Sequence, residues 1–257
     1  MDKDVIETEA TSAVKDLIRR NPYLSPYIDE NDKTPIWDGH IYVYTSINSG
    51  KNNKALIGRV PTQIKGHNTK TGFPFEIKYP LRKTDLIAYQ SEGGVIFIVV
   101  YVNDLYVTQI YFEQLLPLDI ERLLSQMHEQ ENKSIIFKKI PTDTLQLANL
   151  FVNFIEDRKK QMGTVDKNKL HLSDWENSKD IGTYKFHISS VQAPYFNPFQ
   201  VLSSSSFYLY GKPNSLNLEI PLERVDHGII QTSKLHDIGC CNSQVLKVGV
   251  NCHSASA

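Results

Sequence analysis

The fold of this chain is decided by two neighbouring stretches, IWDGHIYVY at residues 36–44 and ALIGRVPTQIKGH at residues 55–67. β-Branched and aromatic side chains dominate residues 41–47, and apolar and polar positions alternate over residues 56–64. The residues between them, 48–54, are polar. The pattern predicts two strands joined by a turn, a hairpin that carries unusual polar side chains.

Three of these polar residues are placed so that they can meet. Asp38 stands where the first strand begins, and Gln63 and Lys65 are two residues apart near the end of the second strand, so the latter two share one face of the sheet. A carboxylate and an amide oxygen can hold a divalent cation, while an ammonium group steadies an anion or the attacking water. This group suits metal-assisted hydrolysis of phosphodiesters. The structural alternative is that Asp-Gly forms a turn and that the other two side chains are only solvated.

The Asp-Gly step followed by Gln-x-Lys on a strand resembles the PD-(D/E)xK restriction-endonuclease-like superfamily, in which glutamine often replaces the second acid. Over residues 4–127 the chain is similar to the nuclease domains at the N-terminus of bacterial anti-phage defence proteins. The resemblance implies a mixed central sheet flanked by helices and a metal-dependent nuclease, acting on DNA rather than RNA, with Mg²⁺ or Mn²⁺ as cofactor. It implies that Asp38, Gln63 and the Ile64 carbonyl hold the metal, and that Lys65 orients the water and stabilises the phosphate.

The chain begins with a predicted amphipathic helix over residues 4–20, which the Asn-Pro pair at 21–22 ends. Glu7 and Glu9 lie at opposite edges of its apolar face. In the family that the chain resembles, a glutamate of the first helix helps to hold the metal; Glu7 fits that pattern better, and Glu9 is the second candidate. A helix dipole also favours acidic residues in the first turn whatever the function.

Charge is unevenly distributed, although the formal net charge is only −1. Residues 51–85 carry eight basic side chains against two acidic ones, whereas residues 1–38 carry nine acidic against five basic. A basic region beside a candidate metal site is what a phosphate backbone requires, and the alternative is a solvated loop rich in lysine. Tyr44, His67 and Lys78 are further candidates for substrate contact.

The remainder of the first region predicts an α/β or α+β fold, because strands and helices begin to alternate after a run of strands. Residues 95–102 form the most apolar run and predict a strand buried on both faces. We expect loops or turns over 23–35 and 66–72, further strands over 73–79, 105–112 and 135–140, and helices over 84–89, 117–129 and 142–160.

A charged stretch at residues 156–169 predicts a boundary between a nuclease domain over 1–160 and a small β-rich region over 165–257. The second region contains no recognisable motif, and Asp-His-Gly at 226–228 is typical of a turn. We expect it to be a sensor, a dimerisation surface or a partner-binding surface. Its β-like runs are at 184–191, 206–210 and 216–220, followed by a poorly packed end over the last eighteen residues.

No apolar stretch is long enough to span a membrane, and the acidic N-terminus has no secretory signal. Cys240, Cys241 and Cys252 form no disulfide framework; with His253 they could be imagined as metal ligands, but an incidental role is the simpler interpretation. We therefore expect a cytoplasmic protein with no membrane partner. Homo-oligomerisation is plausible because cutting two strands usually needs two sites. The rival to the nuclease hypothesis is a non-catalytic module that retains the fold and binds nucleic acid or protein.

Overall fold

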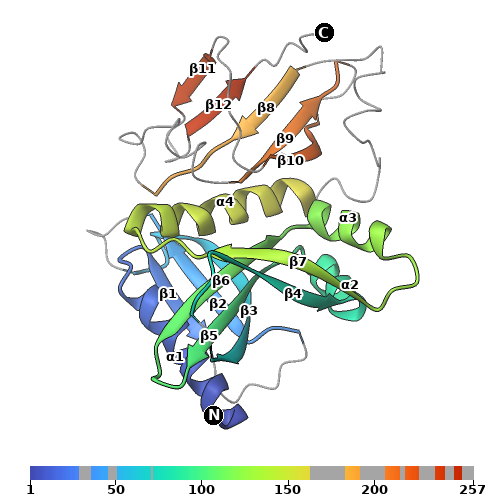
Figure 1. Ribbon diagram of the computed structural model, residues 1–257. Coiled ribbons are helices and arrows are strands. Elements are labelled where there is room, and N and C mark those ends of the chain that lie inside the picture. The colour runs from blue at the N-terminus through green and yellow to red at the C-terminus, as the bar shows by residue number, and fades with distance from the viewer. Residues whose placement is uncertain are drawn as a thin grey trace. The chain divides into compact units, whose positions relative to one another are not determined.

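The computed structural model describes residues 1–28, 36–45, 51–70, 72–162, 183–191, 206–214, 218–225, 235–240 and 246–250. The chain divides into two compact units, Met1–Phe151 and Val152–Ala257 (Figure 1). Helix α4 (Thr144–Met162) begins in the first unit and ends in the second. Among the helices in these ranges, none is both long enough and apolar enough to cross a membrane.

The first unit is a mixed α/β structure around a seven-stranded sheet in the order β1-β2-β3-β5-β6-β7-β4. Neighbouring strands are antiparallel except β3 and β5, which are parallel. The strands are β1 (Leu24–Ile28), β2 (Gly39–Tyr44), β3 (Leu56–Thr69), β4 (Glu76–Arg82), β5 (Val95–Asn103), β6 (Thr108–Leu115) and β7 (Asn132–Lys139). The helices of this unit, besides the start of α4, are α1 (Lys3–Arg19), α2 (Lys83–Ser91) and α3 (Pro117–Met127).

The core of this unit lies around β5, whose first six residues are all buried, as the apolar run predicts. On one face of the sheet, Phe97 and Val99 pack with Tyr89 of α2 and Phe137 of β7. Strand β7 pairs with β6 at one end only, and the β4/β7 pair crosses the other strands (Figure 1). Helix α1 packs on the opposite face, against β3.

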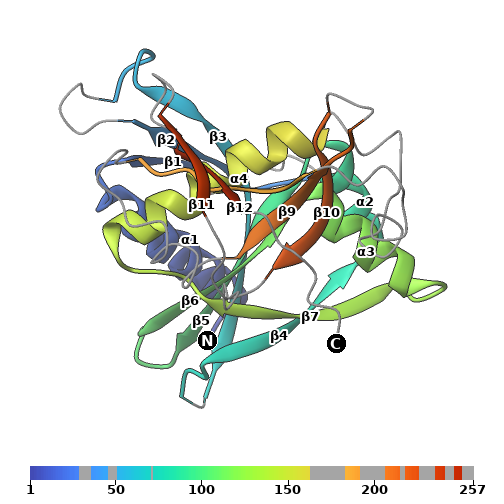
Figure 2. The same ribbon diagram turned by 90° about the horizontal axis from the view of Figure 1, so that it is seen from above.

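Several predicted elements are confirmed, among them α1, α3 and β5, and others differ from the prediction. Residues 24–28 form β1 rather than a loop; Pro26 is tolerated because β1 is an edge strand, paired only with β2 (Figure 2). Strand β3 continues through residues 66–69 instead of turning, because β5 pairs with it as far as Thr69. Strands β4 and β6 each lie three residues later than predicted.

The second unit contains a five-stranded antiparallel sheet in the order β10-β9-β8-β12-β11. The last eighteen residues were expected to be poorly packed, but residues 246–250 among them form β12, which pairs with strands on both sides. The strands are β8 (Thr183–His187), β9 (Phe207–Lys212), β10 (Ile220–Val225), β11 (Leu235–Cys240) and β12 (Leu246–Val250).

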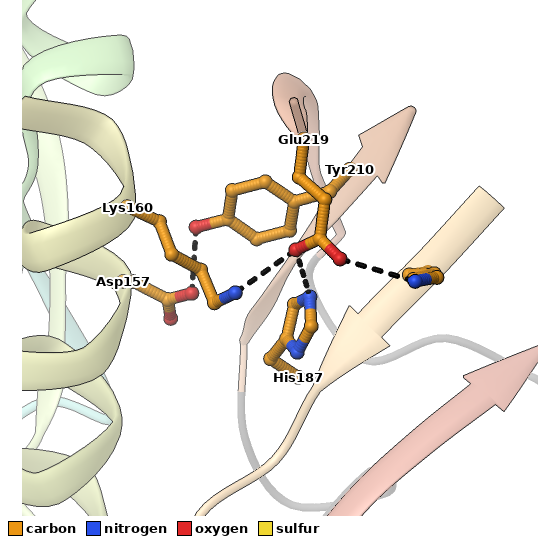
Figure 3. A network of polar contacts seen from close by, with 6 residues as sticks. Asp157, Lys160, His187, Tyr210 and Glu219 are labelled. Atoms are coloured by element: carbon orange, nitrogen blue, oxygen red, sulfur yellow. Dashed lines mark hydrogen bonds and ion pairs between the residues drawn. The ribbon is translucent and has the colours of Figure 1, made fainter. Parts of the chain in front are cut away.

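Glu219, just before β10, is the centre of a polar network in this unit (Figure 3). Its carboxylate accepts a hydrogen bond from Lys160 of α4 over 2.9 Å and from Lys185 of β8 over 3.2 Å. The Nε2 atom of buried His187 lies 2.7 Å from the same carboxylate. The bond from His187 and the nearby lysine charge hold the pKa of Glu219 well below its usual range. The network therefore joins the C-terminal half of α4 to the sheet.

Tyr210 provides a second connection between α4 and the sheet. Its hydroxyl donates a hydrogen bond to Oδ1 of Asp157 over 2.7 Å, and its ring lies 5.5 Å from the Lys160 ammonium group. Burial and the Asp157 carboxylate raise the pKa of Tyr210 far above its usual value, so the phenol stays protonated. The network thus holds α4 and the strands together through paired polar groups.

Candidate functional site

Asp38 lies at the end of the β2–β3 ladder. Gly39 pairs with Thr62 in the register, and the Asp38 amide donates a hydrogen bond to the Thr62 carbonyl over 3.1 Å. Asp38 is therefore placed beside Gln63. Glycine is required at position 39, because φ is 153° there and a Cβ would lie 2.7 Å from the Ile28 Cα atom of β1. The Asp-Gly step thus lets β1 approach closely while Asp38 turns into the site.

One carboxylate oxygen of Asp38 makes both of its hydrogen bonds. Oδ2 accepts from Nε2 of Gln63 over 2.6 Å and from the amide of Ile64 over 2.6 Å. The second bond caps a main-chain group that β2 is too short to reach, so Asp38 also has a structural role. Within the described part of the chain, Oδ1 of Asp38 and Oε1 of Gln63 have no hydrogen-bond partner.

A third oxygen faces the same side of β3. In an antiparallel ladder the N–H and C=O groups of one residue point in the same direction. Because the Ile64 amide points toward Asp38, the Ile64 carbonyl also points toward the β2 side of β3, beyond the residue at which β2 begins. A carboxylate, an amide and a main-chain carbonyl are the oxygen donors that hard divalent cations prefer.

Lys65 supplies the positive charge of the group. Its side chain is exposed and alternates with Ile64 and Gly66, so it leaves β3 on the same face as Gln63. No ion pair or hydrogen bond engages it among the residues that the structure describes. Its charge lowers the pKa of Asp38.

Helix α1 packs on the face of β3 opposite to Gln63 and Lys65, and Glu7 lies in its first half. A Cβ on Gly66 would lie only 2.8 Å from the Ile6 carbonyl oxygen, so the helix touches β3 at this point. The charge of Glu7, the next residue, raises the pKa of Asp38. Glu9 is half-buried and lies about 200° further round the helix, which directs it away from Glu7. The structure therefore associates Glu7 with Asp38 more closely than Glu9.

The pKa of Asp38 is raised above its ordinary value, chiefly because burial disfavours the carboxylate. The Ile64 amide, the Lys65 charge and the Gln63 amide oppose this effect, in that order, and Glu7 adds to it. The negative charge of Asp38 is thus only partly compensated by the protein. A cation bound beside it would favour the charged form.

The three residues proposed for substrate contact lie in different places. His67 follows Lys65 on the same face, and its ring lies 5.3 Å from that of Tyr79 and 5.9 Å from that of Tyr101; burial lowers its pKa. Lys78 is exposed and alternates with Tyr79, which faces the core, so it points away from the site. Tyr44 is buried at the other end of β2, about 20 Å along the strand from Asp38, and does not join the group.

Tyr89 of α2 is a neighbour of the site that sequence reasoning missed. It is buried, and its pKa is strongly raised by burial and by the charges of Asp85 and Asp38. Its position in a short helix gives no signal of this proximity, since only the crossover from β4 to β5 brings α2 beside Asp38.

Groups of three or more His, Cys, Asp or Glu side chains arranged to hold a metal are not found among the described residues. Cys241, Cys252, His253 and the Asp-His-Gly turn lie outside those residues. Comparison of the chain with protein-family models, with curated proteins and with solved structures found no match in any of the three.

Proposed function

We propose that this chain is a metal-dependent nuclease of the PD-(D/E)xK type, with Asp38, Gln63 and Lys65 at its centre. The single observation that carries the proposal is the register that sets Asp38 beside Gln63, with Lys65 on the same face and near enough to lower the pKa of Asp38. Gln63 and Lys65 follow Asp38 by 25 and 27 positions in the sequence, so their convergence with it needs the β2–β3 pairing.

The oxygen atoms present fit a hard divalent cation. Asp38, Gln63 and the Ile64 carbonyl would hold Mg²⁺ or Mn²⁺, and Glu7 would add a second negative charge. The metal would supply a polarised water and charge stabilisation at the phosphate. Lys65 would neutralise the extra negative charge of the phosphate as it is attacked, and would orient the water through its N–H groups. Of the two Asp38 carboxylate oxygens, Oδ1 would hold the metal, because Oδ2 is occupied by Gln63 and Ile64.

The arrangement of the first unit also supports the superfamily proposal. An antiparallel β2–β3 pair carries the polar residues, β5 joins β3 in parallel, and α1 packs over β3. By the same resemblance we propose DNA, rather than RNA, as substrate, a cytoplasmic location and a role as an effector in anti-phage defence. The second unit would then be a sensor or a dimerisation surface.

One observation favours a second candidate function, a binding module without catalysis. The bond from Asp38 to the Ile64 amide gives the carboxylate a structural use. Gln63 also leaves the group one negative charge poorer than two acids would, which weakens metal affinity. Under this alternative the fold persists and no bond is cut.

The test is incubation of the purified chain with plasmid, linear duplex and single-stranded DNA and RNA, in Mg²⁺ or Mn²⁺ and in EDTA. Metal-dependent cutting that Asp38→Asn abolishes supports the proposal. Titration of Mg²⁺ and Mn²⁺ by calorimetry follows if no substrate is cut. A chain that neither cuts nor binds either metal is a binding module.

A further inference from the structure

The sheet face that carries Asp38 continues as an aromatic surface across β1 and β2. Residues directly opposite in an antiparallel pair share a face, and Tyr42 lies opposite Arg59, as Tyr27 lies opposite His40. Every second residue of a strand points to the same face, so Tyr42 and His40 share the face of Asp38. Strands β1, β2 and β3 lie side by side at one end of the sheet (Figure 2).

The rings of this surface differ in exposure, since Tyr27 is exposed and Tyr42, His40 and Trp37 are half-buried. Tyr27, the fourth of the five residues of β1, is 61% exposed, and its ring centroid lies 4.5 Å from that of half-buried Tyr42. Nearer the site, the rings of Trp37 and His40 are 6.0 Å apart. A ring pair with one exposed member, on strands that lead to the proposed catalytic group, fits a ligand with flat, apolar faces.

Positive charge accompanies the rings. Arg59 is exposed and directly opposite Tyr42, and Lys65 follows on the same face of β3. The distance from Tyr42 to Asp38 along β2 is about 13 Å, four residues of strand. On the far side of Lys65, the ring of His67 contacts Tyr79. Along this face, Arg59 and the Tyr27–Tyr42 ring pair thus lie on one side of Lys65, and His67 with Tyr79 lies on the other.

From this arrangement we infer that the substrate is single-stranded nucleic acid, with unpaired bases stacked on Tyr27 and Tyr42 and the backbone beside Arg59. The inference rests on the proposed nuclease function and specifies its substrate. Single strands are bound by basic grooves with aromatic stacking platforms. In a duplex the base faces are covered by one another and only their edges are accessible, so exposed rings on a sheet cannot stack on them.

The experiment measures binding separately from cleavage. The full chain is titrated, in EDTA, into fluorescently labelled single-stranded DNA, single-stranded RNA and blunt duplex DNA of one length, and anisotropy is followed. The variants are Tyr27→Ala, Tyr42→Ala and the ring-preserving Tyr27→Phe. Tyr106→Ala is the matched control, since Tyr106 is a 58% exposed tyrosine in the β5–β6 turn, away from β1 and β2.

Single strands should bind more tightly than the duplex. Tyr27→Ala and Tyr42→Ala should each weaken that binding about five- to hundredfold, while Tyr27→Phe and Tyr106→Ala leave it unchanged. The DNA and RNA arms decide which sugar is preferred. Duplex bound as tightly as single strands, or single strands bound equally by all four variants, would overturn the inference. Equal binding of single strands by all four variants would indicate that the aromatic surface binds a protein partner instead.

Failure of the two proposals can be told apart. Ring-dependent binding of single strands without any cleavage in Mg²⁺ or Mn²⁺ would support the aromatic surface and contradict the nuclease. Metal-dependent cleavage of duplex that is insensitive to Tyr27→Ala and Tyr42→Ala would support the nuclease and overturn the single-strand inference.

Discussion

The side-chain amide of Gln63 donates a hydrogen bond to Oδ2 of Asp38 over 2.6 Å, across the point where the β2–β3 ladder ends. Among the described residues, this contact leaves Oδ1 of Asp38 and Oε1 of Gln63 without a hydrogen-bond partner. Asp38 already caps the Ile64 amide, so ending the ladder does not require Lys65. The exposed Lys65 beside the Asp38–Gln63 pair therefore points to a role beyond ending the ladder.

Asp38→Asn should leave the protein at least as stable as the wild type at neutral pH. Burial raises the pKa of Asp38, so its charged form is disfavoured in the fold; this carboxyl contributes stability at acid pH that is lost as pH rises through its folded pKa. Asparagine keeps an oxygen for the Ile64 amide and removes the charge. Urea unfolding from pH 4 to 8 measures the effect. A loss of more than about 1 kcal/mol at pH 7 would show that the charge itself stabilises the fold.

Metal affinity should rise with pH above the ordinary range of an aspartate. A proton competes with the cation for Asp38, and the raised pKa extends that competition to higher pH. Calorimetric titration with Mn²⁺ at several pH values measures this, with Asp38→Asn as control. A flat profile in the wild type, or equal affinity in the variant, would separate Asp38 from the metal.

Gly66→Ala should destabilise the first unit and reduce cleavage. Its Cβ would lie 2.8 Å from the Ile6 carbonyl and 2.9 Å from the Ile6 Cγ2 atom, so α1 must shift and carry Glu7 with it. The expected cost is about 1–3 kcal/mol. Gly72→Ala is the control, because a Cβ there meets nothing within 4 Å. Thermal unfolding of the two variants compares them, and equal melting temperatures would show that α1 does not press on β3.

Glu219→Gln should loosen the second unit at neutral pH. The pKa of Glu219 is held low by His187 and Lys160, so its stabilising contribution is present above the unfolded value of about 4.3 and is lost as pH falls below it. Hydrogen exchange of β8, β9 and β10 should quicken in the variant at pH 6, and the difference from the wild type should shrink at pH 3. A difference that grows on acidification would contradict the network described here.

Local sequence predicted the elements whose signals are local. The apolar run of β5, Pro117 at the start of α3 and the amphipathic pattern of α1 needed no tertiary information. Strand β1 and the last residues of β3 are set by pairing with β2 and β5, which overrides the Pro and Gly signals in their sequences. Helix α4 also begins at residue 144 rather than 142, where the Asp143 side chain accepts hydrogen bonds from the Leu145 and Gln146 amides.

The candidate site divides in the same way. Strand periodicity placed Gln63 and Lys65 on one face, and the hairpin brought Asp38 to them. Periodicity did not reveal that Asp38 caps the Ile64 amide, nor that α2 brings Tyr89 near. Tyr44 and Lys78 were proposed from their residue type alone. Tyr44 lies at the far end of β2 and Lys78 points away from the site on β4, so neither joins the group.

The most direct test of the nuclease proposal is the rate of metal-dependent cleavage by Lys65→Ala beside Lys78→Ala. Both lysines are exposed on strands and both changes remove one positive charge, so stability should stay within about 0.5 kcal/mol of the wild type in each. Lys65→Ala should lose about a hundredfold or more in rate, because the positive charge facing the phosphate is gone. Lys78→Ala should cut at nearly the wild-type rate. Equal rates in the two variants, or cleavage by Lys65→Ala at the wild-type rate, would contradict the proposed site.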